Sequence, residues 1–323
     1  KICKILLVIL AIFLCVAFYE LLGICVAYKK QPEVSNTTKK ETKNGSWNEC
    51  SENTERAVII EKNPEALLQR VRLIKNAKKE IILSTFAFQS DESGKLILGA
   101  LHDAADRGVH IRLLVDGMES WIDMEGNPYF YGLSSHENVE IKLYNKANPL
   151  KPWKMMGRMH DKYLIADGKR YILGGRNTYN YFLGDFPGHK NYDRDVLVVC
   201  DEPEKENSVN QLSEYFETIW EQEDSGYFHD NKKLANRKSV KNAVLELQNG
   251  YQKYFEENKE RICDTDYTDE TFETEKIALV SNPIHTGSKE PVVWYQLGEL
   301  MKNAKNRVKI HTPYIICNDM MYN

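Results

Sequence analysis

The sequence has no strong excess of charge of one sign. Its 323 residues carry 43 Lys and Arg against 47 Asp and Glu, a net charge of −4. Proteins that hold nucleic acid over much of their surface are usually strongly basic, so this balance makes nucleic acid an unfavoured partner. The seven cysteines lack metal-ligand spacing, so no cysteine-rich metal centre is expected. Most are expected to be buried free thiols, with a Cys50–Cys263 disulfide as an alternative.

The chain also lacks a methionine at residue 1, which is Lys, so the sequence reads as a fragment at its start. The apolar run from Ile5 to Tyr28 is interrupted by Glu20 and has lysines on both sides. A run of this length predicts a transmembrane helix. We therefore assign residues 1–28 to a single-pass N-terminal anchor, expected in a bacterial cell membrane. Because lysines flank the run on both sides, they do not determine which end faces the cytoplasm. A secretory signal peptide is the alternative, although the run is long and no small-x-small cleavage site follows it.

Residues 29–56 are rich in Ser, Thr, Asn, Lys and Glu, a composition that predicts a flexible polar linker. Beyond this linker, helical and strand patterns alternate. Helices are predicted over residues 63–79 and 93–108, and strands over residues 81–88, 109–115 and 139–144. This alternation predicts an α/β sandwich with a mainly parallel sheet, whose ligands bind in the loops after the strands.

One stretch of the chain predicts a β-hairpin. The apolar runs 163–166 and 171–173 are joined by Asp167-Gly168, a strong turn signal. His160 and Lys162 are two residues apart, so they would share one face of the first strand. A turn centred on residues 168 and 169 would place them opposite Asn177 and Gly175, respectively.

The side chains of this hairpin suit phosphoryl transfer. An imidazole acts as a nucleophile or as a general acid or base. The ammonium of Lys162 can bind one phosphate oxygen and the amide of Asn177 can donate to a second, so neither a metal nor another cofactor is needed. Gly174 and Gly175 would leave room for a ligand beside the backbone.

These residues resemble the HKD motif of the phospholipase D superfamily, which reads His-x-Lys, then Asp after four residues, then Gly-Gly-x-Asn after six more. The matching positions are His160, Lys162, Asp167, Gly174, Gly175 and Asn177, and the spacing agrees throughout. The segments 85–88 and 104–117, together with Arg158 and Arg194-Asp195, look most similar to bacterial cardiolipin synthases and related phosphatidyltransferases.

The resemblance implies a phospholipase D-like αβαβα sandwich and a two-step reaction. One histidine would attack phosphorus and form a phosphohistidine, while a second protonates the leaving alcohol. In this chain His160, Lys162 and Asp167 would be catalytic, with His160 as the nucleophile. Gly174, Gly175 and Asn177 would bind the substrate, and Asp195 would orient a histidine from behind. We expect Asp167 to order the hairpin or to pair with a partner half, not to transfer protons.

The family uses two such motifs, but the sequence contains one. Leu73–Thr85 aligns without gaps on Leu300–Thr312, an internal repeat that predicts a second copy of the αβ unit. We therefore expect residues 57–275 to form the first half and residues 276–323 to begin a second, truncated half. The missing part of the same chain would supply the second motif, and a homodimer partner is the alternative. His311-Thr312-Pro313-Tyr314 would belong to the opening strand of that half.

The function expected from these features is a membrane-anchored phospholipid phosphodiesterase or phosphatidyltransferase, similar to cardiolipin synthase or phospholipase D, with an alcohol or water as acceptor. A nuclease of the same superfamily is one alternative, because residues 145–190 carry nine Lys and Arg against three Asp and Glu. A non-catalytic, membrane-tethered homologue is another. Aromatic and Met residues in the loops 117–135 and 145–159 either contact lipid or pack onto the core.

Overall fold

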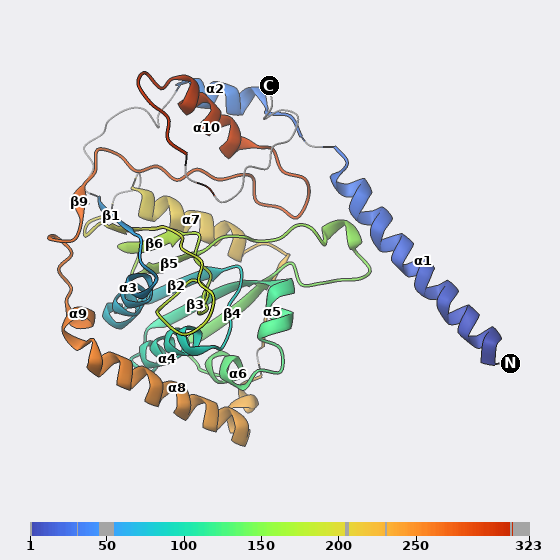
Figure 1. The fold of residues 1–323 in the computed structure, drawn as a ribbon, viewed down its shortest axis with the longest axis horizontal. Coiled ribbons are helices and arrows are strands. Elements are labelled where there is room, and N and C mark those ends of the chain that lie inside the picture. The colour runs from blue at the N-terminus through green and yellow to red at the C-terminus, as the bar shows by residue number, and fades with distance from the viewer. Residues whose placement is uncertain are drawn as a thin grey trace.

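A central mixed sheet flanked by helices organises the computed structural model, which describes residues 2–30, 32–44, 55–203, 207–229, 231–310 and 312 (Figure 1). The described residues form nine strands in the order β8-β4-β3-β2-β5-β6-β7-β1-β9. The strands are β1 Arg56–Ile60, β2 Glu80–Thr85, β3 His110–Asp116, β4 Val139–Tyr144, β5 Tyr163–Ala166, β6 Arg170–Gly174, β7 Asp195–Val199, β8 Ser225–Tyr227 and β9 Phe272–Glu273. The helices are α1 Ile2–Tyr28, α2 Asn36–Asn44, α3 Asn63–Asn76, α4 Glu92–Asp106, α5 Gly117–Asp123, α6 Pro128–Ser134, α7 Ser208–Trp220, α8 Lys238–Glu257, α9 Lys259–Cys263 and α10 Val292–Lys302, with 3-10 turns at Pro152–Lys154 and Lys232–Asn236.

The predicted α/β sandwich is confirmed, and its sheet is mixed. Strands β2, β3 and β4 pair in parallel, as the alternation of helix and strand predicts. The β5–β6 hairpin is inserted beside β2 and pairs with it antiparallel. The carboxyl ends of β2, β3 and β4 therefore meet the amino ends of β5 and β7 at one edge of the sheet. We call this edge, which carries Thr85, Asp116 and Asp195, the motif edge.

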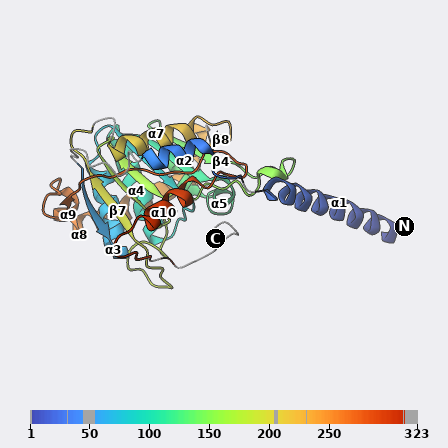
Figure 2. The same ribbon diagram turned by 90° about the horizontal axis from the view of Figure 1, so that it is seen from above.

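The sheet has a hydrophobic core on each face, because successive side chains along a strand point to opposite sides. Helices α3, α4, α6 and α8 cover one face, where Leu83 and Leu113 are buried. Helix α7 covers the other face, where Ile82 and Leu114 pack against Phe216. Figure 2 shows these layers from above. The segment before α10 extends the α7 layer through Ile277, Leu279 and Ile284.

The amino-terminal helix α1 is long and apolar enough to cross a membrane by length and composition. Both views show it leaving the body of the protein, with its amino end farthest away (Figures 1 and 2). Its cysteines, Cys3, Cys15 and Cys25, are exposed, as is Cys263, whereas Cys200 is buried in the core. The prediction that most cysteines are buried is therefore wrong for these residues, since α1 has no protein around most of its length. Cys50, and with it the alternative disulfide, lies outside the described residues.

The segment after α1 differs from the predicted flexible linker. Residues 36–44 form helix α2, and residues 45–54 lie outside the described part of the chain. The Ser35 hydroxyl accepts a hydrogen bond from the Thr38 amide, which stabilises the first turn of the helix. Glu290 then accepts hydrogen bonds from the Ser35 amide (2.8 Å) and the Thr38 hydroxyl (2.7 Å). Polar composition alone did not reveal this docking, because its partner lies 252 residues away along the chain.

The internal repeat is visible in part. Helix α10 forms where the alignment with α3 predicts a helix. The following residues, 306–310, pair with no strand among the described residues and leave Val308 and Ile310 exposed. A strand needs a neighbouring strand for its backbone hydrogen bonds, and the described part of the structure offers none beside residues 306–310. The expected strand at His311–Tyr314 lies outside the described residues except for Thr312.

Candidate active site

The HKD-like residues open into a cavity of about 370 Å³ at the motif edge, on the α7 side of the sheet. The cavity is lined by Arg158, His160, Asp161, Lys162, Tyr163, Leu173, Gly174, Leu212, Tyr215, Leu279, Val280, Ser281, Asn282, Lys289 and Val293. It therefore brings together His160, Lys162 and Gly174 from the predicted set. Its lining does not include Asp167, Gly175, Asn177 or Asp195.

The hairpin register differs by one residue from the prediction. Ala166 pairs with Arg170, which leaves three residues in the loop and makes Lys162 the neighbour of Gly174 instead of Gly175. The turn is centred on Asp167 and Gly168, whose φ angles are +55° and +62°. Residues with positive φ suit the twist of a tight hairpin, so the turn signal was correct but its centre was one residue too late.

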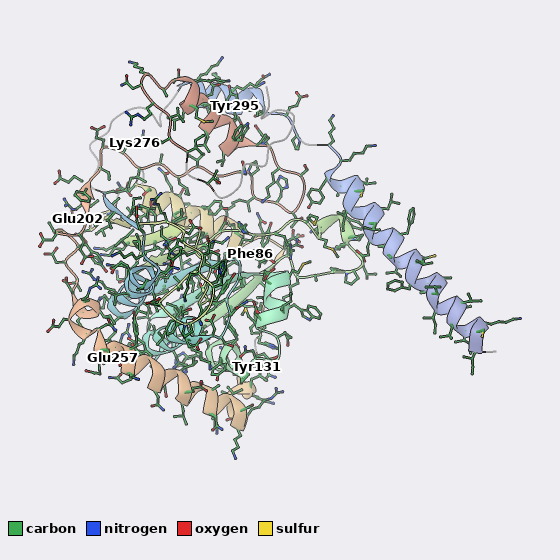
Figure 3. The ribbon with its side chains drawn as sticks, viewed as in Figure 1. Phe86, Tyr131, Glu202, Glu257, Lys276 and Tyr295 are labelled. Carbon is green, nitrogen blue, oxygen red and sulfur yellow. The ribbon has the colours of Figure 1, made fainter. Side chains whose placement is uncertain are left out.

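His160 lies before the strand instead of within it. The strand β5 begins at Tyr163, so the side chains of residues 160–162 need not alternate between the two faces of the sheet. All three residues line the cavity. The imidazole stacks at a tilt on Phe86, with 4.7 Å between ring centroids. Phe86, labelled in Figure 3, directly follows β2. Partial burial and the nearby Lys162 charge lower the pKa of His160, while Asp161 opposes the shift.

Lys162 is buried, with 5% of its surface exposed. Its ammonium donates to the carbonyl of His160 (2.6 Å) and lies 5.2 Å from the centre of the Phe86 ring. Burial lowers the pKa of Lys162 to about 8, against the raising influence of Asp161 and other carboxylates. At neutral pH the site therefore pairs an uncharged imidazole with a charged ammonium, the combination needed to attack an anionic phosphate ester.

Asp161 contributes a carboxylate to the same cavity. The Tyr215 hydroxyl on α7 donates a hydrogen bond of 2.8 Å to it. Burial raises the pKa of Asp161, while this hydrogen bond and the Lys289 and Lys162 charges lower it. Residue 161 is the variable position of the motif, so its spacing carried no signal. The sequence analysis also missed Tyr215, because its contact with Asp161 depends on how α7 packs on the sheet.

Asp116 and Arg158 hold the chain as it enters the motif. Asp116 ends β3, and its carboxylate accepts a 3.0 Å hydrogen bond from the amide of Met159 and pairs with Arg158 at 3.0 Å. Burial raises the pKa of Asp116, and the Arg158 charge counteracts this. The same carboxylate caps α5 by accepting from the amide of Met118. The segment before His160 is thus fixed to the end of a core strand.

Gly174 and Gly175 make room for protein carboxylates. A methyl group on Gly174 would collide with the carboxylate of Asp195, and one on Gly175 would collide with that of Asp193. Gly174 also borders the cavity, and the predicted role of the two glycines in binding the substrate remains a prediction. Asn177 is buried, and its side-chain oxygen accepts a hydrogen bond of 3.1 Å from the amide of Ala87. Its predicted contact with a phosphate remains a prediction.

Asp167 lies at the other end of β5, away from His160. Its carboxylate accepts hydrogen bonds from three consecutive backbone amides, those of Lys78, Lys79 and Glu80, at 2.7–3.1 Å. It therefore fixes the hairpin turn to the connection between α3 and β2. This geometry fits the ordering role expected for Asp167 and gives it no contact with the imidazole.

Asp195 forms a buried ion cluster and does not orient His160. Its carboxylate lies 2.9 Å from Arg70 and 3.2 Å from Arg176. Its neighbour Val196 packs on the α7 face, so Asp195 points to the opposite face, towards α3. The predicted role behind a histidine is corrected for this reason. Within the described part of the chain, no group of three or more His, Cys, Asp or Glu side chains is arranged to hold a metal ion.

Comparison with known proteins agrees with this geometry. Residues 70–220 match the family described as cardiolipin synthase, PLD-like domain. Cardiolipin synthase C of Escherichia coli is 29% identical over 171 residues, which is 49% of this chain and 34% of that protein. Cardiolipin synthase 1 of Staphylococcus aureus is 34% identical over 117 residues, covering 36% of this chain and 23% of the relative.

An uncharacterized protein of Helicobacter pylori is 29% identical over 288 residues, covering 80% of this chain and 54% of the relative. The chain thus spans about half or less of the length of these curated relatives. Among solved structures, phosphatidylserine synthase of Haemophilus influenzae has a TM-score of 0.45 at 16% identity, covering 68% of this chain and 48% of that one. NucT from Helicobacter pylori has a TM-score of 0.42 at 17% identity, covering 54% and 99%.

The match over residues 70–220 begins in α3 and ends with α7, so it contains the sheet from β2 to β7 and the whole stretch from His160 to Asn177. That stretch has the spacing of the HKD motif, and the fold places its histidine and lysine in one cavity. Residues 70–220 therefore form a phospholipase D-like domain similar to that of cardiolipin synthases.

Proposed function

We propose that this protein is a membrane-anchored phosphodiesterase or phosphatidyltransferase that acts on phospholipids through a phosphohistidine at His160. The observation that carries the proposal is the pairing of an accessible imidazole of lowered pKa with the buried Lys162 ammonium in one cavity. An uncharged imidazole nitrogen has the lone pair needed for attack. A fixed ammonium nearby stabilises the negative charge that gathers on the phosphate oxygens.

In the first step a nitrogen of His160 forms a bond to phosphorus, and the bond from phosphorus to the headgroup oxygen breaks. That oxygen leaves as an alcohol after taking a proton from a general acid. In the second step water or another alcohol loses a proton and attacks phosphorus, and the nitrogen–phosphorus bond breaks. The second HKD motif implied by the resemblance, from a longer chain or a second copy, would supply the acid and base.

Lipid is the proposed substrate class because the cavity belongs to a chain with an apolar helix of membrane-spanning length. A phosphodiester of nucleic acid offers the same reacting group, so the chemistry of His160 and Lys162 does not distinguish the two. The overall net charge of −4 favours lipid over a polynucleotide, because binding of a polynucleotide gains from an excess of positive charge on the protein.

The test uses the chain with its α1 helix reconstituted in vesicles that contain headgroup-labelled phosphatidylglycerol. Release of labelled glycerol with formation of cardiolipin would support transfer, and formation of phosphatidic acid would support hydrolysis. His160→Ala should remove the activity. His110→Ala is the matched control, because His110 begins β3 at the opposite edge of the sheet and pairs with Glu140.

Two outcomes would contradict the proposal. Cleavage of labelled single-stranded DNA without lipid turnover would assign a nuclease to the same site. No turnover of either substrate, in the presence of a second HKD motif, would favour a non-catalytic homologue. Equal loss of activity in His160→Ala and His110→Ala would point to a folding defect instead of a catalytic role.

A further inference from the structure

Helix α1 contacts the loop that leads into the HKD motif. The Tyr19 hydroxyl donates a hydrogen bond of 3.0 Å to the carbonyl of Leu150. Gly23 faces Pro152 so closely that an added methyl group would lie 2.5 Å from the proline ring. Both contacts fall on residues 145–159, which we call the motif loop because it ends directly before His160. Hydrogen bonds within the loop stabilise it, since the side-chain amide of Asn145 donates to the carbonyls of Lys154 and Gly157.

The position of this contact along α1 fixes its depth relative to a bilayer. Glu20 is the acidic residue of α1 and lies between Tyr19 and Gly23. A carboxylate is costly inside the hydrocarbon core of a bilayer, so a spanning α1 places Glu20 at the boundary between lipid and water. Tyr19 and Gly23 then lie at the same boundary. The motif loop that contacts them lies at the same level.

The motif loop presents apolar side chains to the outside at this level. Leu150 is 77% exposed, Met156 is 59% exposed and Trp153 is 45% exposed. Nearby, helix α5 exposes Trp121 and Ile122 at about two thirds of their surface or more. Figures 1 and 2 both place α5 on the side of the domain from which α1 departs. Large apolar side chains gathered on one side of a soluble domain mark a contact surface.

The chemistry of these side chains fits a lipid surface. Tryptophan is favoured at membrane interfaces, where its ring meets the apolar boundary and its N–H remains solvated. Lys29 and Lys30 directly follow α1 and Lys151 lies in the motif loop; all three are exposed and suit the negative headgroups of anionic lipids. A second protein could also cover apolar side chains, but a partner would have to share this level with the bilayer entered by α1.

We propose that Leu150, Trp153 and Met156 of the motif loop, with Trp121 and Ile122 of α5, insert into the interfacial layer of the membrane beside α1. This contact seats the cavity of His160 at the lipid surface. The inference deepens the proposed function, on which it rests for its consequence on turnover, and it assigns an interaction surface with the bilayer itself as partner.

Tryptophan fluorescence tests the surface without reference to catalysis. Helix α1 contains no tryptophan, so its insertion alone places none in lipid. The chain is reconstituted in vesicles of phosphatidylglycerol and phosphatidylcholine, with and without brominated acyl chains that quench nearby indoles. The quenched fraction should fall in Trp153→Phe relative to the unchanged chain. It should not fall in Trp220→Phe, because Trp220, the last residue of α7, is 4% exposed and packs in the core between α7 and the sheet. An equal quenched fraction with and without Trp153 would overturn the proposal.

Turnover tests the consequence of the contact. Leu150→Asp with Trp153→Asp should lower the rate on vesicles on the order of ten-fold by weakening interfacial binding, and leave the rate on a water-soluble short-chain phospholipid unchanged. Leu245→Asp on α8 is the matched control, since Leu245 is 57% exposed and helix α8 lies apart from α1 in Figure 1. Equal loss on both substrates would overturn the proposal. Absence of turnover in the unchanged chain, in the presence of a second HKD motif, would contradict the proposed function, while the quenching result would still decide whether the surface exists.

Discussion

Lys162 combines deep burial with a function that requires its charge. The ammonium is held by the carbonyl of His160 and the face of the Phe86 ring, neither of which carries a full negative charge. Its pKa near 8 records the cost of keeping this charge away from water. The same desolvation strengthens the attraction of the ammonium for a phosphate oxygen, because less water screens it.

The first prediction concerns the pH dependence of kcat/KM. His160 must be uncharged to attack, and its pKa is lowered, so activity should persist to a pH below the ordinary imidazole range before it falls. Lys162 must be charged, and its pKa is about 8, so activity should fall as the pH rises through that value. In Lys162→Arg the alkaline decrease should disappear, since a guanidinium stays charged. An unchanged alkaline limb in this variant would assign that limb to another group.

The second prediction concerns stability. The folded-state pKa of Lys162 is about 8, below the value of about 10.4 for an unfolded lysine, so its charge opposes folding below pH 8 and this opposition fades towards pH 10. Lys162→Met should therefore raise the free energy of unfolding at pH 7 by about 1–2 kcal/mol, after the lost hydrogen bond to His160 is counted. Urea unfolding in detergent at pH 7 and pH 10 measures the difference.

The matched control for this experiment is Lys169→Met, in the exposed hairpin turn. Its effect should stay within about 0.5 kcal/mol at both pH values, as is usual for surface substitutions. Destabilisation by Lys162→Met at pH 7, or a gain that grows with pH, would show that the buried ammonium is compensated by contacts stronger than those described.

At this scale the sequence predicted which residues carry the chemistry better than what they contact. The fixed spacing identified His160 and Lys162, and the fold brings both to one cavity. It did not reveal Phe86, Asp161 or Tyr215, because their contacts depend on the packing of β2 and α7 beside the motif. Asp195 was assigned by similarity of position, whereas the face to which its side chain points depends on the strand register.

At the scale of elements, the β5–β6 hairpin shows how the motif also serves the fold. Asp167 in its turn receives three backbone N–H groups from the start of β2. Two of these amides precede β2 and the third begins it, so a carboxylate that accepts all three satisfies backbone donors at the point where the strand starts. The spacing between His160 and Asp167 thus corresponds to one short strand, β5, with the imidazole before it and the carboxylate that fixes the turn after it.

The third prediction follows from this arrangement. Asp167→Ala should lower the free energy of unfolding by about 2–3 kcal/mol, because it removes the acceptor and places alanine at a positive φ. The kcat/KM of the folded variant should stay within about two-fold of the unchanged protein. Asp167→Asn keeps an acceptor and tolerates the turn, so it should be less destabilised. A loss of activity of about a hundred-fold in a folded variant would instead indicate proton transfer by Asp167.

Hydrophobic alternation predicted the strands β2, β3 and β4 and their helices because these elements follow directly along the chain. The position of the hairpin between β2 and β7 depends on long-range pairing and carried no local signal. The short helices α5 and α6 were expected as loop, yet Asp116 caps the first and Asn127 with Pro128 begins the second. These capping residues could have predicted both helices from the sequence, but only the aromatic and Met residues of these segments were considered.

At the scale of the whole molecule, α1 and the domain meet over a small area. Residues 2–14 project beyond this contact, and the large apolar side chains among them are more than half exposed. The fourth prediction is that deletion of residues 2–14 leaves the free energy of unfolding of the domain unchanged within about 0.5 kcal/mol. Flotation with vesicles should nevertheless be lost, because the motif-loop surface alone binds lipid weakly and reversibly.

Unchanged flotation of this shortened chain would show that α1 is dispensable for membrane association. Loss of domain stability would show instead that the helix packs on the protein more extensively than described. The unfolding measurement and the flotation measurement therefore separate an anchor from a structural helix. A deletion limited to residues 2–14 also keeps Tyr19 and Gly23, so the shortened chain and the unchanged chain share the same contact with the motif loop.

The close contact between Gly23 and Pro152 has a consequence for the orientation of the whole protein. Helix α1 is apolar on all sides, so lipid gives it no preferred rotation about its own axis. Pro152 fits against Gly23, and the hydroxyls of Tyr19 and Tyr28 reach the carbonyls of Leu150 and Thr286. These contacts fix the rotation of α1 about its own axis relative to the domain. When α1 rotates in the membrane, the domain therefore rotates with it, and the opening of the cavity keeps the same direction relative to the helix.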